Sequence, residues 1–126
     1  MNPNEIEDNE ILYRVVRKSN PDGFIDEKPS PALFIDSNGA SVDRDGERSE
    51  AEIVETFKNR FQRRNDYKTA VKIGAKACRE IQTYPNPIGN KKNIYHAEIW
   101  DSEDEREISL LKAIKLANLC SEVEGK

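Results

Sequence analysis

The stretch Asn93-Ile94-Tyr95-His96-Ala97-Glu98-Ile99-Trp100-Asp101 carries the only histidine and the only tryptophan of the chain. Apolar and polar side chains alternate along it from Tyr95 to Trp100, and this period of two predicts a β-strand. A basic segment precedes the stretch, and a helix-like segment follows it directly. We therefore expect this strand to be the middle strand of a sheet that helices cover.

Two other segments have the signals of amphipathic helices. Ser49-Glu50-Ala51-Glu52 has the spacing of a capping box, and apolar residues follow at helical spacing, so we predict a helix from Glu50 to about Arg63. Ser102-Glu103-Asp104-Glu105 has the same pattern and predicts a helix that ends at about Ser121. The expected core face of this second helix consists of Leu110, Ala113, Ile114, Ala117 and Cys120.

The remaining segments complete a small sheet. Residues 11–17 predict a strand, residues 40–43 and 69–73 predict shorter ones, and the prolines of residues 84–90 predict a loop. The fold class that follows is α+β, a small mixed sheet of about four to five strands with two main helices packed on it. A chain of 126 residues is long enough for one domain. We expect that domain at residues 11–121, after a flexible acidic tail at 1–10 and before a frayed C-terminus at 122–126.

Composition limits the classes of function. The net charge of −4 argues against a protein that binds polyanions through its overall charge. Cys78 and Cys120 lie too far apart for a metal-binding pattern and no second histidine accompanies His96, so we expect neither a metal site nor a cofactor. The chain has no leader-like segment and no apolar run of membrane-spanning length, so we expect a cytoplasmic protein that does not enter a membrane.

Four residues are candidates for a functional site, namely Arg14, Ser41, His96 and Glu98. If Leu12 faces the core, Arg14 shares its face, and a buried arginine needs a partner. A histidine can act as an acid, a base or a ligand near neutral pH, although a lone histidine in a strand is more often structural. The interpretation that we favour is a buried ion pair between Arg14 and Glu98 that holds two strands in register.

Arg14, Ser41 and Glu98 also resemble the arginine–serine–glutamate arrangement of some ADP-ribosyltransferases. That resemblance implies that Arg14 holds a phosphate of NAD and that Glu98 orients the ribose. The chain departs from this family at position 96, where His96 stands in place of the first residue of a Gln-x-Glu-type element.

Several short motifs resemble those of a family of small, uncharacterised bacterial proteins. The motifs are Leu12-Tyr13-Arg14, Ala32-Leu33-Phe34, Ser41-Val42, Cys78 and His96-Ala97-Glu98-Ile99. The second motif departs from the Ser-Ala-Phe form that is usual in that family. The resemblance implies no activity, but it implies that Arg14, Phe34, Ser41 and His96 belong to one scaffold.

The sequence leaves three functions open, and we favour the first. It is a non-enzymatic binding or accessory module of the bacterial cytoplasm that acts through a protein partner or by self-association. An apolar strip of Ile108, Leu116 and Leu119 would make that contact. The second function is a small NAD-using enzyme that transfers ADP-ribose or cleaves NAD. The third is a nucleic-acid binder that uses the basic block at residues 58–79, namely Arg63, Arg64, Lys68, Lys72 and Lys76.

Overall fold

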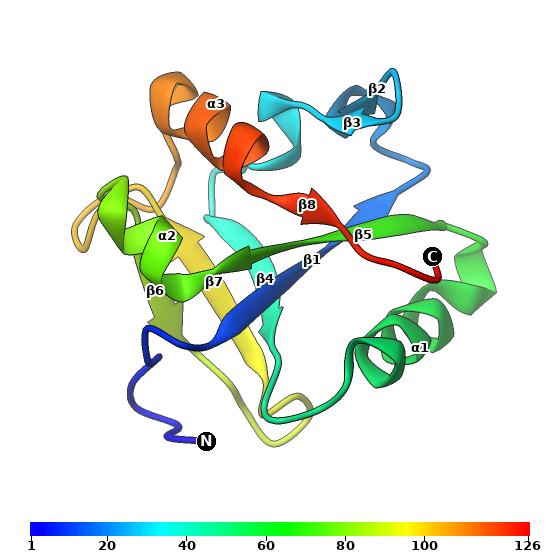
Figure 1. Ribbon diagram of the computed structural model, residues 1–126, viewed down its shortest axis with the longest axis horizontal. Helices are drawn as coiled ribbons and strands as arrows, with labels where there is room; N and C mark the ends of the chain where they lie inside the picture. Colours follow the sequence, from blue (N-terminus) through cyan, green and yellow to red (C-terminus); the bar gives the residue numbers. More distant parts are fainter.

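The computed structural model describes all of residues 1–126. Its main element is a six-stranded sheet in which all neighbouring strands are antiparallel (Figure 1). Across the sheet the strands are β6 (Tyr84–Pro87), β7 (His96–Trp100), β4 (Ala40–Arg44), β1 (Ile11–Arg17), β5 (Tyr67–Gly74) and β8 (Ser121–Glu122). The helices are α1 (Glu50–Phe61), α2 (Ala75–Glu80) and α3 (Leu110–Leu119). A two-stranded sheet of β2 (Phe24–Ile25) and β3 (Lys28–Pro29) and three 3-10 helices, η1 (Pro21–Gly23), η2 (Pro31–Leu33) and η3 (Gln62–Arg64), lie in the connections.

The α+β class predicted from the sequence is confirmed, whereas the details of the sheet differ. Six strands rather than four or five form it, and it is antiparallel rather than mixed. The strand that carries His96 is not the middle strand, because β4 and β1 occupy the centre and β7 lies beside the edge strand β6. The additional strands β6 and β8 come from residues that were predicted as a loop and as the end of the chain.

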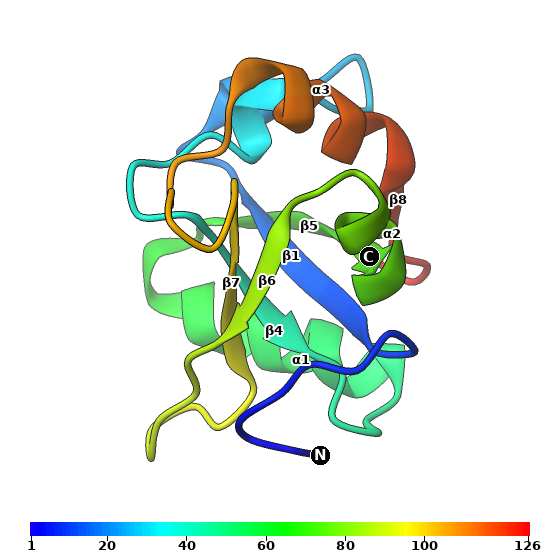
Figure 2. The same ribbon diagram turned by 90° about the vertical axis from the view of Figure 1, so that its left-hand side faces the viewer.

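Both faces of the sheet are covered, so the molecule has three layers (Figures 1 and 2). On one face α1 packs through Ile53 and Phe57 against Tyr13 of β1. On the other face α2, α3 and η2 contribute to a core of 18 buried residues that includes Leu12 and Val16. Residues of β1 therefore belong to both cores.

The first long helix begins where the sequence predicts. The Ser49 hydroxyl oxygen accepts a hydrogen bond from the backbone N–H of Glu52, as expected for an N-cap. The helix ends at Phe61, and the next three residues form η3. This boundary depends on contacts within one turn of helix, which is why the local pattern predicts it well.

The last helix begins seven residues later than the second capping-box pattern predicts. Ser102 and Glu105 form an isolated β-bridge instead of a helix start, and Ser109 is the N-cap of α3. Ile108, just before this N-cap, is 1% exposed. Its burial favours the later start, because the turn at Ser102 brings this apolar side chain into the core. No helix of the protein combines the length and apolar character needed to cross a membrane.

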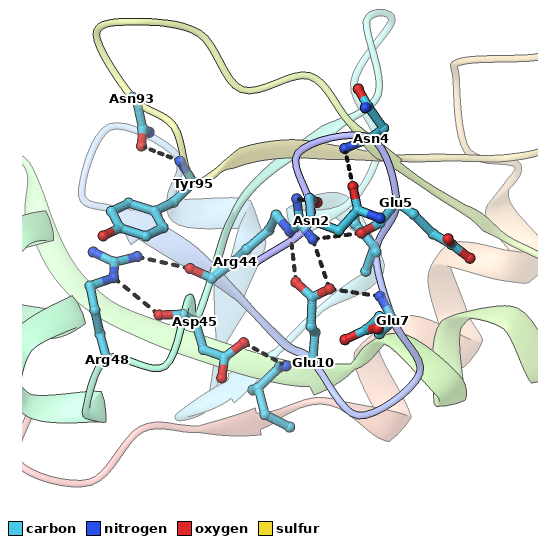
Figure 3. A network of polar contacts seen from close by, with 12 residues as sticks. Asn2, Asn4, Glu5, Glu7, Glu10, Arg44, Asp45, Arg48, Asn93 and Tyr95 are labelled. Atoms are coloured by element: carbon cyan, nitrogen blue, oxygen red, sulfur yellow. Dashed lines mark hydrogen bonds and ion pairs between the residues drawn. The ribbon is translucent and has the colours of Figure 1, made fainter.

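Each end of the chain places one apolar side chain in the core. Ile6 is 1% exposed within the main core, and Val123 is 2% exposed against the α1 side. Arg44 at the end of β4 is 1% exposed and donates to both carboxylate oxygens of Glu10, at 2.6 and 2.7 Å. Its remaining donors reach the backbone carbonyls of Asn2 and Glu5, each at 2.8 Å (Figure 3). The segment predicted as a flexible tail thus contributes a core residue and a buried ion pair.

Candidate functional site

The candidate residues lie where the two central strands separate. Strands β1 and β4 pair at only two positions, the second of which joins Tyr13 to Asp43. Continuing that register would set Val15 opposite Ser41, but no such pair forms, while β1 stays paired with β5 along its whole length. A gap therefore opens between β1 and β4.

Arg14 fills part of this gap. Its Nε donates to the backbone carbonyl of Leu33 and its Nη1 donates to that of Ser41, each at 2.7 Å. The Nη1 group therefore donates to a carbonyl of β4 that would otherwise accept from a backbone N–H of β1. These two hydrogen bonds fix its position and leave Nη2 without a partner in the protein.

The ion pair between Arg14 and Glu98 that the sequence favours is absent. None of the ion pairs of the protein includes Arg14. Burial lowers the pKa of Arg14 to about 10, and the Asp36 carboxylate opposes this shift, so the side chain stays charged at neutral pH. A half-buried cation with only neutral hydrogen-bond partners is uncommon. Its charge is therefore available to an anionic ligand.

A hollow of about 280 Å³ opens beside this arginine. Arg14, Ser41 and His96 all line it, so the structure brings three of the four candidates together. Its opposite wall comes from the C-terminal half of α1, which contributes Phe57 and Phe61. A site built from β1, β4, β7 and α1 depends on the tertiary fold.

Glu98, the fourth candidate, lies next to the hollow rather than in its wall. Strand β7 pairs Glu98 with Ser41 and His96 with Asp43. On one face of the sheet Glu98 therefore stands beside Ser41 and one pleat away from His96. The Trp100 indole Nε1 donates to Glu98 Oε1 at 2.9 Å, which leaves Oε2 free.

Gly39 makes room for the indole that holds Glu98. Its φ is +91°, and a Cβ atom there would lie 2.6 Å from Trp100 Cδ1, so only glycine fits. Tyr84 packs against the indole at a ring-centroid distance of 6.1 Å, and the Arg106 guanidinium lies 5.0 Å from the ring. The indole is thus held on several sides and gives the Glu98 carboxylate a fixed position.

The other arginines of the wall and Asp43 are paired within the protein, whereas the Asp36 carboxylate, which also lines the hollow, forms no ion pair. Asp43 is 2% exposed and its Oδ2 lies 3.0 Å from Arg60 Nη2. Arg17 pairs with Asp66 at 2.6 Å. Arg14 is therefore the one arginine of the wall without a carboxylate partner.

Aromatic rings form the α1 side of the hollow. Phe57 is buried and Phe61 is half-buried, with the guanidinium of Arg60 5.3 Å from the first ring and that of Arg17 5.2 Å from the second. Phe57 is 1% exposed, so Phe61 is the ring that a planar ligand could contact, and an anionic group would find Arg14. The sequence did not single out Arg60 or the two phenylalanines, although the spacing of three between Phe57 and Arg60 places both on one side of a helix.

Thiol chemistry does not suit this chain. Burial raises the pKa of Cys78 to about 12 and that of Cys120 to about 11. Neither residue is a thiolate near neutral pH, which a nucleophile or a metal ligand would need to be. No three or more histidine, cysteine or acidic side chains are grouped closely enough to hold a metal ion.

Comparison with known proteins gives no function for the chain. The chain matches no protein-family model, no curated protein and no solved structure. What the protein does must therefore be argued from the chemistry of its sites.

The apolar strip predicted to meet a partner is largely inside the protein. Ile108 and Leu116 are 1% and 0% exposed, so these two residues are unavailable to a partner, and only Leu119 is exposed. The predicted core face of α3 is partly wrong for the same reason, because Leu110 and Ile114 are exposed where Leu116 is buried. The residues sit on the expected helix, but its later start and its packing against η2 determine which side faces inward.

The basic block does not form one face either. Lys72 forms an ion pair with Glu50 on the α1 side at 2.7 Å, while Lys68 lies 5.5 Å from the ring of Phe24. The five residues named for nucleic acid are distributed over η3, β5 and α2, namely Arg63, Arg64, Lys68, Lys72 and Lys76. A continuous phosphate-binding stripe would need them on one surface.

Proposed function

We propose that the hollow between β1 and β4 binds NAD through its nicotinamide mononucleotide half, and that the protein cleaves the bond between nicotinamide and ribose. The observation that carries this proposal is Arg14, a charged arginine without a carboxylate partner, in one hollow with Ser41 and His96 and next to Glu98. The resemblance of Arg14, Ser41 and Glu98 to the ADP-ribosyltransferase arrangement supports the same reading.

The size and lining of the hollow suit half of a dinucleotide. Ligand pockets usually enclose about 300–1,000 Å³, so a hollow of about 280 Å³ takes a ring, a ribose and a phosphate rather than all of NAD. The phosphate would bind the free Nη2 of Arg14, and the nicotinamide ring would lie against the half-buried Phe61. The adenosine half would extend out of the hollow over the surface.

Glu98 supplies the charge that the reaction needs. When the bond between ribose C1′ and the nicotinamide nitrogen breaks, its electron pair leaves with neutral nicotinamide and the ribose becomes cationic, as in glycoside cleavage. The carboxylate of Glu98 stabilises that cation through its free Oε2, and the Ser41 hydroxyl binds a ribose oxygen. Water then forms the new C–O bond and releases a proton, which gives ADP-ribose. A carboxylate or hydroxyl of another molecule would give ADP-ribosyl transfer instead.

This proposal replaces the binding module as the favoured function for two reasons. The buried pair between Arg14 and Glu98, which would have explained both residues structurally, does not form. The strip that would have carried a partner has Ile108 and Leu116 in the core. The enzyme therefore accounts for more of the structure than the binding module does.

Replacing Arg14 with lysine is expected to weaken NAD binding by about 10-fold or more, because a hydrogen bond to a charged group contributes about 1.5–3 kcal/mol. Lysine keeps the positive charge but cannot donate to the carbonyls of Leu33 and Ser41 and to a phosphate with one fixed group. Isothermal titration with NAD, ADP-ribose and nicotinamide mononucleotide measures the effect and shows which half of NAD the hollow holds.

The matched control is Arg63→Lys, at an exposed arginine of η3 that does not line the hollow. Because Arg63 is outside the site and forms no ion pair, this change should leave the affinity for NAD nearly unaltered. Equal affinity in wild type and Arg14→Lys, or no binding of NAD to the wild type, would contradict the proposal.

A further inference from the structure

A second and larger hollow lies beyond Arg60, between α1 and the loop that joins β6 to β7. It encloses about 810 Å³ and is wide open. Four cations line it, namely Arg48, Arg60, Lys91 and Lys92, together with the amides of Asn59 and Asn93. No acidic side chain is part of its wall.

The cations divide into a fixed pair and a free pair. Arg60 lies 3.0 Å and Arg48 4.0 Å from the buried Asp43 carboxylate, so one negative charge is shared between two arginines. Lys91 and Lys92 are exposed and take part in no ion pair. The hollow therefore keeps an excess of positive charge in a protein whose net charge is −4.

Hydrogen bonds from two asparagine side chains fix the conformation of the loop that carries the two lysines. Asn90 Oδ1 accepts from the backbone N–H groups of Lys92 and Asn93, at 2.8 and 3.0 Å. Asn93 Nδ2 donates to Asp43 at 3.2 Å, and its Oδ1 accepts from the backbone N–H of Tyr95. The lysines thus extend from a braced turn.

The opposite rim is equally fixed. The Arg48 guanidinium stacks on the Tyr95 ring at 3.6 Å and donates to the carbonyls of Arg44 and Asp45 (Figure 3). Gly46 lies against the edge of the same ring, where a Cβ would be 2.4 Å from Cε1. The Arg48 guanidinium therefore occupies one face of the Tyr95 ring, on which a base would otherwise stack.

We propose that this hollow binds the phosphate backbone of a nucleic acid. Lysine and arginine side chains that face an open groove without acidic residues fit a ligand that repeats its negative charge along its length. The amides of Asn59 and Asn93 offer further donors to phosphate oxygens. With this face of Tyr95 occupied, contacts go to the backbone rather than to bases, so binding does not depend on base sequence. None of the five residues first predicted to bind nucleic acid lines this hollow, and the proposal does not rest on NAD binding.

Fluorescence anisotropy of a labelled oligothymidylate, titrated with the full chain over a series of salt concentrations, tests this assignment. Each phosphate neutralised on a single strand contributes about −0.7 to the slope of log K against log salt concentration. The double variant Lys91→Gln/Lys92→Gln should therefore flatten the slope by about 1.4. It should also weaken binding at low salt.

The matched control is Lys76→Gln/Lys115→Gln, which removes the same charge from two exposed lysines on α2 and α3. It should bind like the wild type if the hollow is the site, and an equal loss in both double variants overturns the proposal. A third variant removes a negative charge near the hollow, because Glu52 lies one helical turn before Thr56, which lines the hollow. Glu52→Gln should strengthen binding. Competition by polyglutamate as strong as by unlabelled oligothymidylate would identify an acidic peptide as the ligand and overturn the assignment to nucleic acid.

Discussion

Replacing Arg44 with methionine is expected to lower the free energy of unfolding by about 3–5 kcal/mol, the usual cost of removing one partner from a buried ion pair. Arg44 is 1% exposed and makes four hydrogen bonds, two to Glu10 and one each to the carbonyls of Asn2 and Glu5. Methionine has a similar length but removes all four hydrogen bonds, and the Glu10 carboxylate keeps only the backbone N–H of Glu7 as a donor. Urea unfolding followed by circular dichroism measures the difference.

Arg79→Met is the matched control, because Arg79 on α2 also forms an ion pair and a hydrogen bond with the N-terminal segment. It pairs with Asp8, whose side chain is 64% exposed, and donates to the carbonyl of Ile6. An ion pair with one partner in solvent contributes about 0–1 kcal/mol, so this variant should lose far less stability. Equal losses in the two variants would mean that the burial of Arg44 has no special importance.

The effect of Arg44→Met should also depend on pH. Burial alone would raise the pKa of Glu10, but the hydrogen bonds from Arg44 and from the Glu7 backbone N–H, with the charge of Arg44, lower this pKa below its ordinary value of 4.5. A carboxylate with a lowered pKa stabilises the fold above its unfolded pKa, and this contribution is lost as the pH falls through the folded pKa. The difference in free energy of unfolding between wild type and Arg44→Met should therefore be largest at neutral pH and should decrease below about pH 4.5.

Replacing Glu98 with glutamine is expected to slow the release of nicotinamide from NAD by about 100- to 1,000-fold, as when one group that stabilises transition-state charge is removed. Glutamine keeps the shape of the side chain and can still accept the hydrogen bond from Trp100, so the fold and the affinity for NAD should change little. The loss should appear in kcat with KM nearly constant, because the carboxylate acts on the cation that forms in the transition state.

Glu103→Gln serves as the control for Glu98→Gln. Glu103 is exposed in the turn after β7, and its removal changes the net charge by the same amount. It should leave both kcat and the melting temperature unaltered. A fall in melting temperature with unchanged kcat in Glu98→Gln would show that Glu98 serves only to hold Trp100.

The sequence predicts helix ends that are set by hydrogen bonds within one turn. It does not predict elements that are set by contacts between residues far apart in the sequence. The capping box at Ser49 requires only one turn of helix, and α1 begins there. The same pattern at Ser102 fails because tertiary packing of Ile108 outweighs it. Strand β6 contains Pro85 and Pro87, which remove backbone donors, so it reads as a loop. It is nevertheless a strand because it lies at the edge of the sheet and needs partners on one side only.

The same division applies to the candidate site. The alternation along β1 identifies Arg14 as an unusual residue, and the short motifs place it with Ser41 and His96, which line one hollow with it. The predicted pair between Arg14 and Glu98 fails for a geometric reason. The Nε and Nη1 groups of Arg14 donate to the carbonyls of Leu33 and Ser41 in the gap between β1 and β4, whereas Glu98 Oε1 accepts from Trp100. Neither set of contacts can be predicted from one strand alone.

Incubation of the purified wild-type chain with NAD, followed by chromatography of the products, shows whether the protein cleaves NAD. If the hollow between β1 and β4 is an NAD-cleaving site, nicotinamide and ADP-ribose should accumulate in equal amounts, or ADP-ribose should be found attached to an acceptor. Intact NAD after prolonged incubation, together with no heat of binding in a titration, would contradict this proposal.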